Sequence, residues 1–304
     1  MKGKNGLLVG VLFVLVGLYF WLRSANEKKL ATFDPVLLQL DTGRIDKVEI
    51  QTPAEEILLK KEAGRWVVQT EEGPIRVDPM RLNALMDMAR ALRASAILTR
   101  DPEKYDQYEV SKEKGKHVRF YSGNKKLAEV TVGGFTYDPT TRTPGNYVRK
   151  GDAVYKVSQF LQMAVPPRPS DYFYPFLAEV PQDSIQRFVL NRGEAHVEVY
   201  REGNQWLRGE VRLDSQKMAG YTVMFASLRG TRIVDPVDTA EHKPYATLQV
   251  YAGQRPTPLI LRAYEKVPDS LYVLHSSYNP HVWFESDTKG LYKRVFHPFW
   301  AEAQ

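Results

Sequence analysis

The sequence of 304 residues contains no cysteine. That absence excludes disulfide bonds, thiolate nucleophiles, zinc sites with cysteine ligands and iron–sulfur clusters. It also excludes a lipid-modified cysteine as the means of attachment to a membrane. A chain without thiols is compatible with a bacterial compartment outside the cytoplasm.

The signature motifs of common enzyme classes are missing as well. There is no Walker-type phosphate loop, no G-x-G-x-x-G, no H-E-x-x-H and no G-x-S-x-G. The chain is therefore not expected to be the ATPase of a transporter. We predict no catalytic residues, no cofactor and no metal site. A hydrolase ranks last among the functions considered, because no paired nucleophile and base can be identified in the sequence.

The chain has little net charge outside its first residues. Its formal charge is +6. Residues 1–29 hold five basic side chains and one acidic one, a net of +4, so the remaining body carries only +2. A nearly neutral body is a poor candidate for binding a polyanion, and we predict no nucleic-acid partner.

One long apolar run is present, the uncharged stretch Gly6–Leu22. As a helix it would span roughly 25 Å, slightly less than a hydrocarbon core of about 30 Å, and flanking basic side chains could extend its reach. We predict a transmembrane helix at about 6–22 within an anchor of residues 1–29. A cleaved signal peptide is the alternative, but cleavage after Ala25 would place Arg23 where a small residue is needed.

The orientation of this segment does not follow from charge, because basic residues lie on both sides of it. We expect a single-pass protein of the bacterial inner membrane with its body outside the cytoplasm. That expectation rests on the absence of cysteine and on the family resemblance described below.

Two stretches of the chain show the same pattern at an offset of 140 positions. Ile57 and Trp66 in EEILLKKEAGRWVV align with Val197 and Trp206 in GEAHVEVYREGNQWLR. Apolar and polar residues alternate in both, which predicts strands with one buried face. The tryptophans are interpreted as core anchors. We infer an internal duplication; the alternative is two unrelated sheets that share a common strand pattern.

A helix is expected after these strands in each copy. Asp78 is a suitable N-cap and Pro79 suits the first helical position, while Asp214 is the corresponding cap in the second copy. The predicted fold class is α+β, with a single N-terminal transmembrane helix followed by a duplicated unit of antiparallel strands with one main helix per copy. The predicted domains are a first repeat at 30–165, a proline- and aromatic-rich joint at 166–184 and a second repeat at 185–304.

The order of motifs resembles the bacterial DUF4340 family. The motifs are RIDKVEI, GRWVV, the capped helix, YDQYEV, AEVTVGG, NYVRKGDAVYKV and SDYFYP, which cover about residues 1–176. One departure is that the family usually has Gly-Leu after the tyrosine at Tyr108, where this chain has Glu109 and Val110. The resemblance implies a membrane-tethered, extracytoplasmic protein beside an ABC transporter of the gliding-motility type, and it implies no catalytic residues.

The interpretation is a non-enzymatic, extracytoplasmic accessory subunit of an ABC-type transport complex. Its expected partners are the permease or auxiliary subunits of the transporter, by resemblance, and the membrane, through residues 6–22. The alternative is an envelope binding module for glycan or peptide ligands. The candidate partner contact is Tyr172, Phe173 and Tyr174, because neighbours in an extended segment face opposite ways and at least one ring should be exposed. The alternative is that these rings simply pack the joint.

Three further features are interpreted as structural. His275 and His281 flank a turn without additional ligands nearby, so they are read as a surface pair and not as a metal site. Gly133 and Gly134 are read as a turn at the end of a strand. The polar loop at 137–146 is read as a solvated hairpin connection, with a ligand-facing loop as the alternative.

Overall fold

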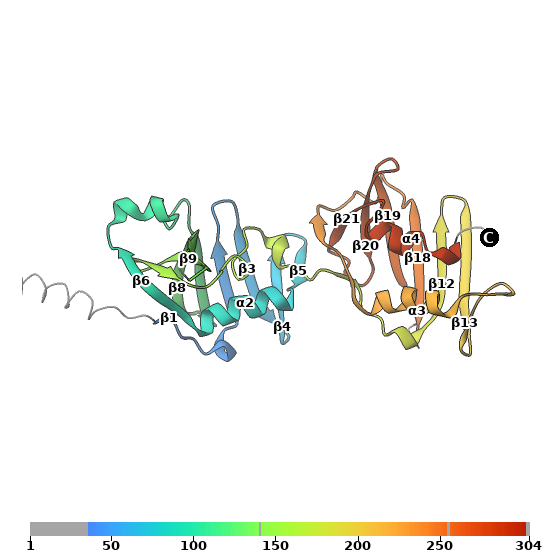
Figure 1. Ribbon diagram of the computed structural model, residues 1–304, viewed down its shortest axis with the longest axis horizontal. Helices are drawn as coiled ribbons and strands as arrows, with labels where there is room; N and C mark the ends of the chain where they lie inside the picture. Colours follow the sequence, from blue (N-terminus) through green and yellow to red (C-terminus); the bar gives the residue numbers. More distant parts are fainter. Residues whose placement is uncertain (1–35, 140, 254–255, 302–304) are drawn as a thin grey trace, which may run out of the picture. The chain divides into compact units, whose positions relative to one another are not determined.

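The protein is described by a computed structural model, which covers residues 36–139, 141–253 and 256–301. The described chain divides into two compact units, and Figure 1 shows the order of their elements along the sequence. The first unit contains the chain up to Glu56 together with Asn83–Val165. The second contains Ile57–Leu82 and the chain from Pro166 onward.

The first unit is built on a sheet in which each strand is antiparallel to its neighbours. Alternate side chains of its strands are buried, as Val118 and Phe120 show, which is the period-two pattern of a half-buried sheet. Two 3-10 helices, η1 (Thr42–Arg44) and η2 (Pro102–Tyr108), lie in its connections. The order of the described strands is β1 (Val36–Leu38), β6 (Leu92–Thr99), β10 (Ala153–Val157), β9 (Thr143–Lys150), β8 (Lys125–Asp138), β7 (Lys116–Ser122) and β2 (Lys47–Gln51).

Helix α2 (Pro79–Arg90) contributes its first residues to the second unit and the remainder to the first. Within the first unit its Leu85 and Ala89 are fully buried. The backbone N–H of Leu40 donates to the carbonyl oxygen of Ala89 at 3.0 Å, so the segment after β1 caps the end of the helix.

The second unit contains a strand meander and a larger antiparallel sheet. The meander is β3 (Glu56–Glu62), β4 (Arg65–Thr70) and β5 (Gly73–Arg76). The larger sheet has the order β15 (Val211–Arg212), β14 (Gln205–Arg208), β13 (Ala195–Glu202), β12 (Ile185–Arg192), β18 (Ala246–Ala252), β19 (Leu259–Val267), β20 (Leu271–Ser276), β21 (Trp283–Asp287) and β17 (Arg232–Val234). A separate ladder joins β11 (Phe176–Ala178) to β16 (Leu228–Arg229).

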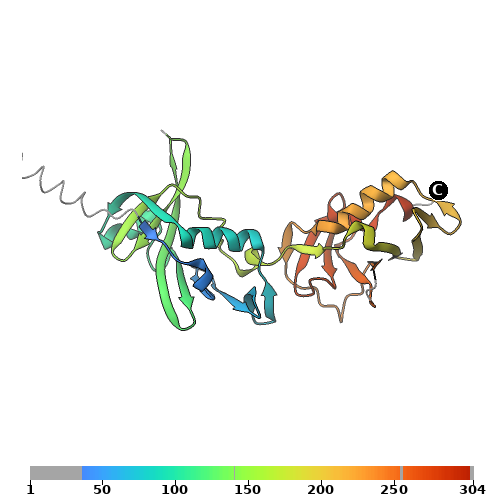
Figure 2. The ribbon, with the colours of Figure 1, turned by 90° about the horizontal axis from the view of Figure 1, so that it is seen from below.

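Short helices complete this unit, and Figure 2 shows α3 along one face of its sheet. The α-helices are α3 (Ser215–Val223) and α4 (Leu291–Phe296). The 3-10 helices are η3 (Pro169–Tyr172), η4 (Gln182–Ser184), η5 (Met224–Ser227) and η6 (Phe299–Ala301).

Aromatic rings fill the core between this sheet and α3. The ring of Phe188 on β12 lies 5.1 Å from Tyr221, 5.3 Å from Phe225 and 5.6 Å from Trp206, measured between centroids. Trp300 lies 6.0 Å from the same ring. Full burial of such rings stabilises a fold by roughly 1.5–3 kcal/mol each, so this cluster is a major contribution to the stability of the second unit.

The two halves of the chain share a strand order. The series β6-β10-β9-β8-β7-β2 corresponds to β17-β21-β20-β19-β18-β12, and the meander β3-β4-β5 corresponds to β13-β14-β15. Lys61 lies opposite Trp66 on the neighbouring strand, and Arg201 lies opposite Trp206 in the same way. Trp206 is 8% exposed, as expected of a core anchor, whereas Trp66 is only half-buried.

The predicted fold class is nevertheless wrong. The chain is mostly antiparallel sheet, with 48% strand and 19% helix, and is not an α+β protein with one main helix per copy. Helices do follow Asp78 and Asp214, but they have only 12 and 9 residues because a strand begins soon after each. The predicted transmembrane segment at 6–22 lies outside the described residues, and no helix within them is both long and apolar enough to cross a bilayer.

Candidate functional site

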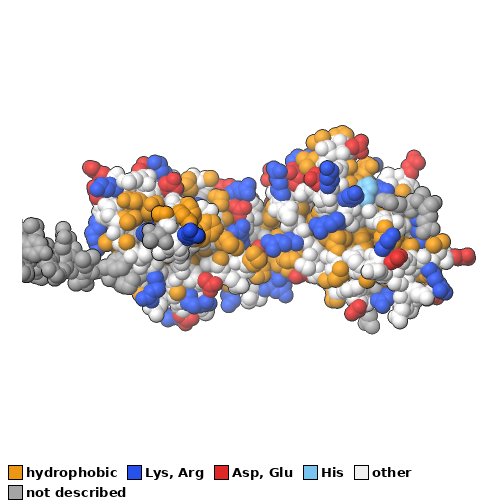
Figure 3. All heavy atoms as spheres, viewed as in Figure 1, with side chains coloured by type: hydrophobic (Ala, Val, Ile, Leu, Met, Phe, Trp, Pro, Cys, Tyr) orange, Lys and Arg blue, Asp and Glu red, His pale blue; other side chains and the backbone are white. Residues whose placement is uncertain are grey.

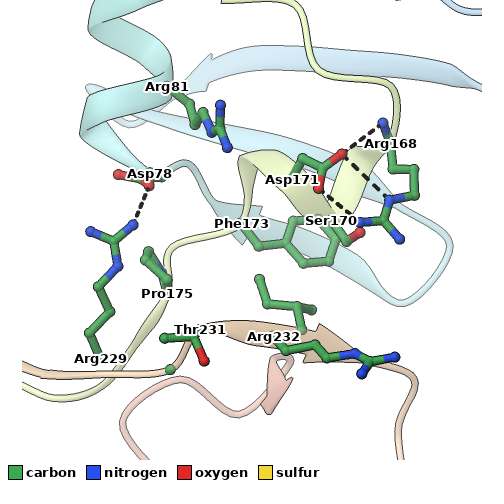
Figure 4. A pocket seen from close by; sticks show the side chains of 12 residues that line it. Asp78, Arg81, Arg168, Ser170, Asp171, Phe173, Pro175, Arg229, Thr231 and Arg232 are labelled. Carbon is green, nitrogen blue, oxygen red and sulfur yellow. Dashed lines mark hydrogen bonds and ion pairs between the residues drawn. The ribbon is translucent and has the colours of Figure 1, made fainter. Parts of the chain in front are cut away.

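A cavity of about 350 Å³ lies in the second unit at the start of α2 (Figure 4). Three segments of the chain form its walls: the first turn of α2, the stretch from Arg168 to Pro175, and the connection between β16 and β17. Four arginines and two aspartates line it, together with the ring of Phe173. The charged residues are Arg81, Arg168, Arg229, Arg232, Asp78 and Asp171.

Asp78 connects the three walls of the cavity through its hydrogen bonds and its ion pair. Its Oδ1 accepts a hydrogen bond from the backbone N–H of Met80 at 3.0 Å, which caps α2. Its own backbone N–H donates to the carbonyl oxygen of Tyr172 at 2.7 Å. Its Oδ2 lies 3.4 Å from Nη2 of Arg229, and its side chain is 8% exposed. The sequence pattern predicts the cap, but only the fold supplies the ion pair.

The second wall is held by backbone pairing and by an internal ion pair. Phe173 forms an isolated antiparallel bridge with Val77. Within the segment, Nη2 of Arg168 lies 3.1 Å from Oδ1 of Asp171, and the backbone N–H of Arg168 donates to Oδ2 at the same distance. The Arg168 guanidinium is therefore positioned by a carboxylate on its own segment.

The third wall depends on a glycine. The N–H of Gly230 donates to the carbonyl oxygen of Pro175 at 2.9 Å. A Cβ atom at Gly230 would lie 2.0 Å from Cδ1 of the Phe284 ring, so no side chain fits there. Arg229 and Arg232 flank this point; Nη1 of Arg232 lies 2.8 Å from Oε1 of Glu285.

Two of the three rings of the expected partner contact at the joint are buried. Tyr172 and Tyr174 are 0% and 4% exposed, and burial raises the pKa of both phenols well above the usual range. The segment is not uniformly extended, because η3 ends at Tyr172 and rotates that ring inward. Phe173 alone is partly exposed, and it faces the cavity. Truncating the two tyrosines is therefore expected to destabilise the protein.

A second feature is a cluster of exposed aromatic side chains in the first unit. Phe135, Tyr137 and Phe160, here called the aromatic patch, are 50%, 52% and 46% exposed. Phe135 and Tyr137 are two residues apart on β8 and so share a face. The ring centroids of Phe135 and Phe160 are 6.1 Å apart in an edge-to-face arrangement. Hydrophobic side chains gather on a face of this unit in the space-filling view (Figure 3).

The two glycines before this patch do not form a turn at a strand end, contrary to prediction. Gly133 and Gly134 lie inside β8, where the pairing with β9 shifts register between Val132 and Phe135. A Cβ at Gly133 would lie 2.3 Å from the carbonyl oxygen of Tyr108, so the glycine permits close approach of that segment. An irregularity of this kind redirects the side chains that follow, here those of the aromatic patch.

His275 and His281 also differ from a simple surface pair. The His275 ring stacks on Trp283 with centroids 4.2 Å apart, and its Nε2 lies 3.1 Å from the carbonyl oxygen of Pro280. Burial lowers the pKa of His275. His281 is exposed. Across the described ranges, no group of three or more histidine, aspartate or glutamate side chains is arranged to hold a metal ion.

Comparison with known proteins identifies a family. A family model described as "Domain of unknown function (DUF4340)" matches residues 66–249. That range contains all three walls of the cavity and the whole aromatic patch. No curated protein and no solved structure matches the chain.

Proposed function

Since the chain belongs to the DUF4340 family, a domain of unknown function, we propose that it is a non-enzymatic accessory subunit of an ABC-type transport complex. Its partners are the permease or auxiliary subunits, and its body lies outside the cytoplasm at the bacterial inner membrane. The apolar stretch at 6–22 is the part of the chain that meets the membrane. The structural observation in favour of this role is the aromatic patch.

The aromatic patch has the properties of a protein-binding surface. Large apolar side chains that cluster at half exposure are uncommon on a protein that works alone, and aromatic residues are enriched at interfaces. Phe135 and Tyr137 lie on strand β8, which has 14 residues and pairs with β9, so both are presented by a hydrogen-bonded hairpin. Rings of this kind carry much of the binding energy when a partner covers them.

A membrane-bound protein can use such a patch efficiently. Attachment to the same membrane raises the local concentration of the partner, so a modest contact surface is sufficient for stable association. The three rings of the patch would then provide specificity, while the apolar stretch at 6–22 keeps the two proteins close.

Purification of the full chain in mild detergent tests this function. The wild-type protein is expected to bring transporter subunits with it. The double variant Phe135→Ser with Phe160→Ser should lose at least nine-tenths of them, because two anchor rings are removed, on the order of 3 kcal/mol of binding free energy. Its circular dichroism melting curve should change little, because both rings are about half exposed.

Tyr200→Ser is the matched control, since Tyr200 is an exposed aromatic residue of the second unit at 38% exposure. It should retain the partners in full. If the wild-type chain brings down no transporter subunit, the accessory role is wrong. If the double variant retains them, the role stands but the contact lies elsewhere.

The alternative function, a binding module for glycan or peptide ligands, has its own supporting observation. The cavity in the second unit is large enough for a small ligand and combines charged, hydroxyl and aromatic groups. The two functions are compatible, because the cavity and the aromatic patch are formed by different residues.

A further inference from the structure

The cavity carries an excess of positive charge on its walls. Four guanidinium groups face two carboxylates, and at least one arginine comes from each of the three walls. Arginine presents five N–H donors in a planar fork, which suits the two oxygens of a carboxylate or phosphate. An anion that enters the cavity therefore meets donors from more than one side.

Part of this donor capacity is already in use, since Arg168 is paired with Asp171 at 3.1 Å. Arg229 is paired with Asp78 at 3.4 Å, and Arg232 is paired with Glu285 at 2.8 Å. Glu285 is shared with Lys266, whose Nζ lies 3.1 Å from Oε2, so one carboxylate faces two cations. The side chains of Arg229 and Arg232 are 44% and 74% exposed, so both remain accessible from solvent.

The remaining lining identifies the class of anion. Asp78 and Asp171 place carboxylates on the walls, and ionised carboxylates accept hydrogen bonds but repel another anion. Ser170 and Thr231 add hydroxyl groups, and Phe173 adds an aromatic ring. Each aspartate already accepts from an arginine side chain and from a backbone N–H, and because a carboxylate has about four lone-pair sites it can accept a further hydrogen bond. A simple phosphate would pair with the arginines but would bring anionic oxygens next to the aspartates. A ligand with one carboxylate and several hydroxyl donors satisfies both.

We propose that the cavity binds an acidic sugar of the uronic acid type. The arginines hold its carboxylate, the aspartates accept hydrogen bonds from its hydroxyl groups, and Phe173 packs against the apolar face of its ring. A volume of about 350 Å³ is of the size that a small ligand of this kind requires. This inference rests on the binding-module function and is independent of the accessory role.

Isothermal titration calorimetry on the purified full chain tests it with four probes. D-glucuronate should bind at least tenfold more tightly than D-glucose, which has the hydroxyls without the charge. It should also bind at least tenfold more tightly than acetate, which has the charge without the hydroxyls, and than inorganic phosphate. Raising the ionic strength should weaken the binding of glucuronate.

Variants locate the binding within the cavity. Arg229→Gln and Arg232→Gln should each weaken glucuronate binding at least tenfold, since each removes a charged hydrogen-bond donor. Arg232→Gln is the safer of the two for folding, because its side chain is 74% exposed. Arg187→Gln is the matched control: it pairs with Glu198 at 3.2 Å on the sheet of the same unit, away from the cavity lining, and should leave binding unchanged.

Several results would overturn the proposal. Equal binding of glucose would show that the arginines do not hold the ligand. Equal or tighter binding of phosphate or acetate would reduce the cavity to a general anion site. Loss of binding in Arg187→Gln would show that the ligand does not bind specifically in the cavity. The absence of heat with every probe would show that the cavity binds none of them. None of these results bears on co-purification with transporter subunits, so failure of this inference and failure of the accessory role are distinguishable.

Discussion

The two halves of the chain differ most clearly at one strand. In the first half, β6 is continuous and pairs with β1 at one end and with β10 further along. In the second half the corresponding strand is split into β16, which pairs with β11, and β17, which pairs with β21. The break at Gly230 and Thr231 forms a wall of the cavity. The two halves thus share a strand order, and the candidate site lies where that order is interrupted in the second half.

A second difference lies in the hairpin of β8 and β9, which is longer in the first half than its counterpart in the second. In the first half β8 has 14 residues with an irregular register at its glycines, and its end carries Phe135 and Tyr137. The corresponding β19 has 9 residues. Both candidate surfaces therefore lie where the halves diverge, whereas the shared strand order provides the support. The following variants are ordered from the largest expected effect to the smallest.

The tryptophans should differ in their contribution to stability. Trp206→Ala is expected to lower the free energy of unfolding by about 4 kcal/mol, because a buried ring beside Phe188 is lost and a cavity is left. Trp66→Ala should lower it by about 1–2 kcal/mol, because Trp66 is only half-buried. Urea denaturation followed by circular dichroism measures both. Equal losses would mean that the two positions are equivalent after all.

The interruption of the strand should not tolerate a side chain. Gly230→Ala is expected to lower the free energy of unfolding by about 3 kcal/mol, since the new methyl group would overlap the Phe284 ring. Gly220→Ala is the control, because a Cβ there meets nothing within 4 Å and lies in α3, where alanine is favoured by about 0.5–1 kcal/mol. Thermal melting of the two variants should move in opposite directions. A Gly230→Ala protein as stable as the wild type would show that this wall can rearrange.

The two helix caps should also be unequal. Asp78→Ala is expected to destabilise the protein by about 2 kcal/mol, because Asp78 caps α2 and also pairs with Arg229. Asp214→Ala should cost about 1 kcal/mol, since Asp214 is an exposed cap that accepts from the N–H of Lys217 at 2.8 Å. Denaturant titration of Asp78→Asn then separates the contributions, because asparagine keeps the cap and removes the charge. Identical losses at Asp78 and Asp214 would contradict a role for the ion pair.

The smallest effect should come from the turn before each tryptophan. Ala63 has φ 46°, a left-handed conformation that favours glycine, and the second half has Gly203 with φ 59° at the position 140 residues later. Ala63→Gly is expected to stabilise the protein by about 0.5 kcal/mol, and Gly203→Ala should destabilise it by a similar amount. Differential scanning calorimetry can resolve shifts of this size. A decrease in melting temperature for Ala63→Gly would show that the Ala63 methyl group makes a packing contact whose stabilising effect exceeds the cost of the left-handed conformation.

Local sequence patterns determined much of the secondary structure. Alternation of apolar and polar residues predicted the strands around Trp66 and Trp206, and Asp78 with Pro79 predicted the start of α2 at the correct residue. Glu109 also has a local conformation of note, since its φ of 55° and ψ of 36° place it in the left-handed region that favours glycine. These features depend on residues close together in the chain, so one sequence is sufficient to read them.

The fold class and the candidate site were decided by tertiary structure. Asp78 and Arg229 are 151 residues apart, and no local pattern indicates that they pair. The need for glycine at 230 comes from the Phe284 ring, and the burial of Tyr172 comes from a 3-10 turn that the aromatic run alone does not predict. Strand and helix preferences act over a few residues, whereas burial, ion pairing and close backbone approach depend on which distant segments the sheets bring together. The sequence by itself therefore determined the repeated strands and the helix starts, and only the fold decided which side chains line the cavity and which fill the core.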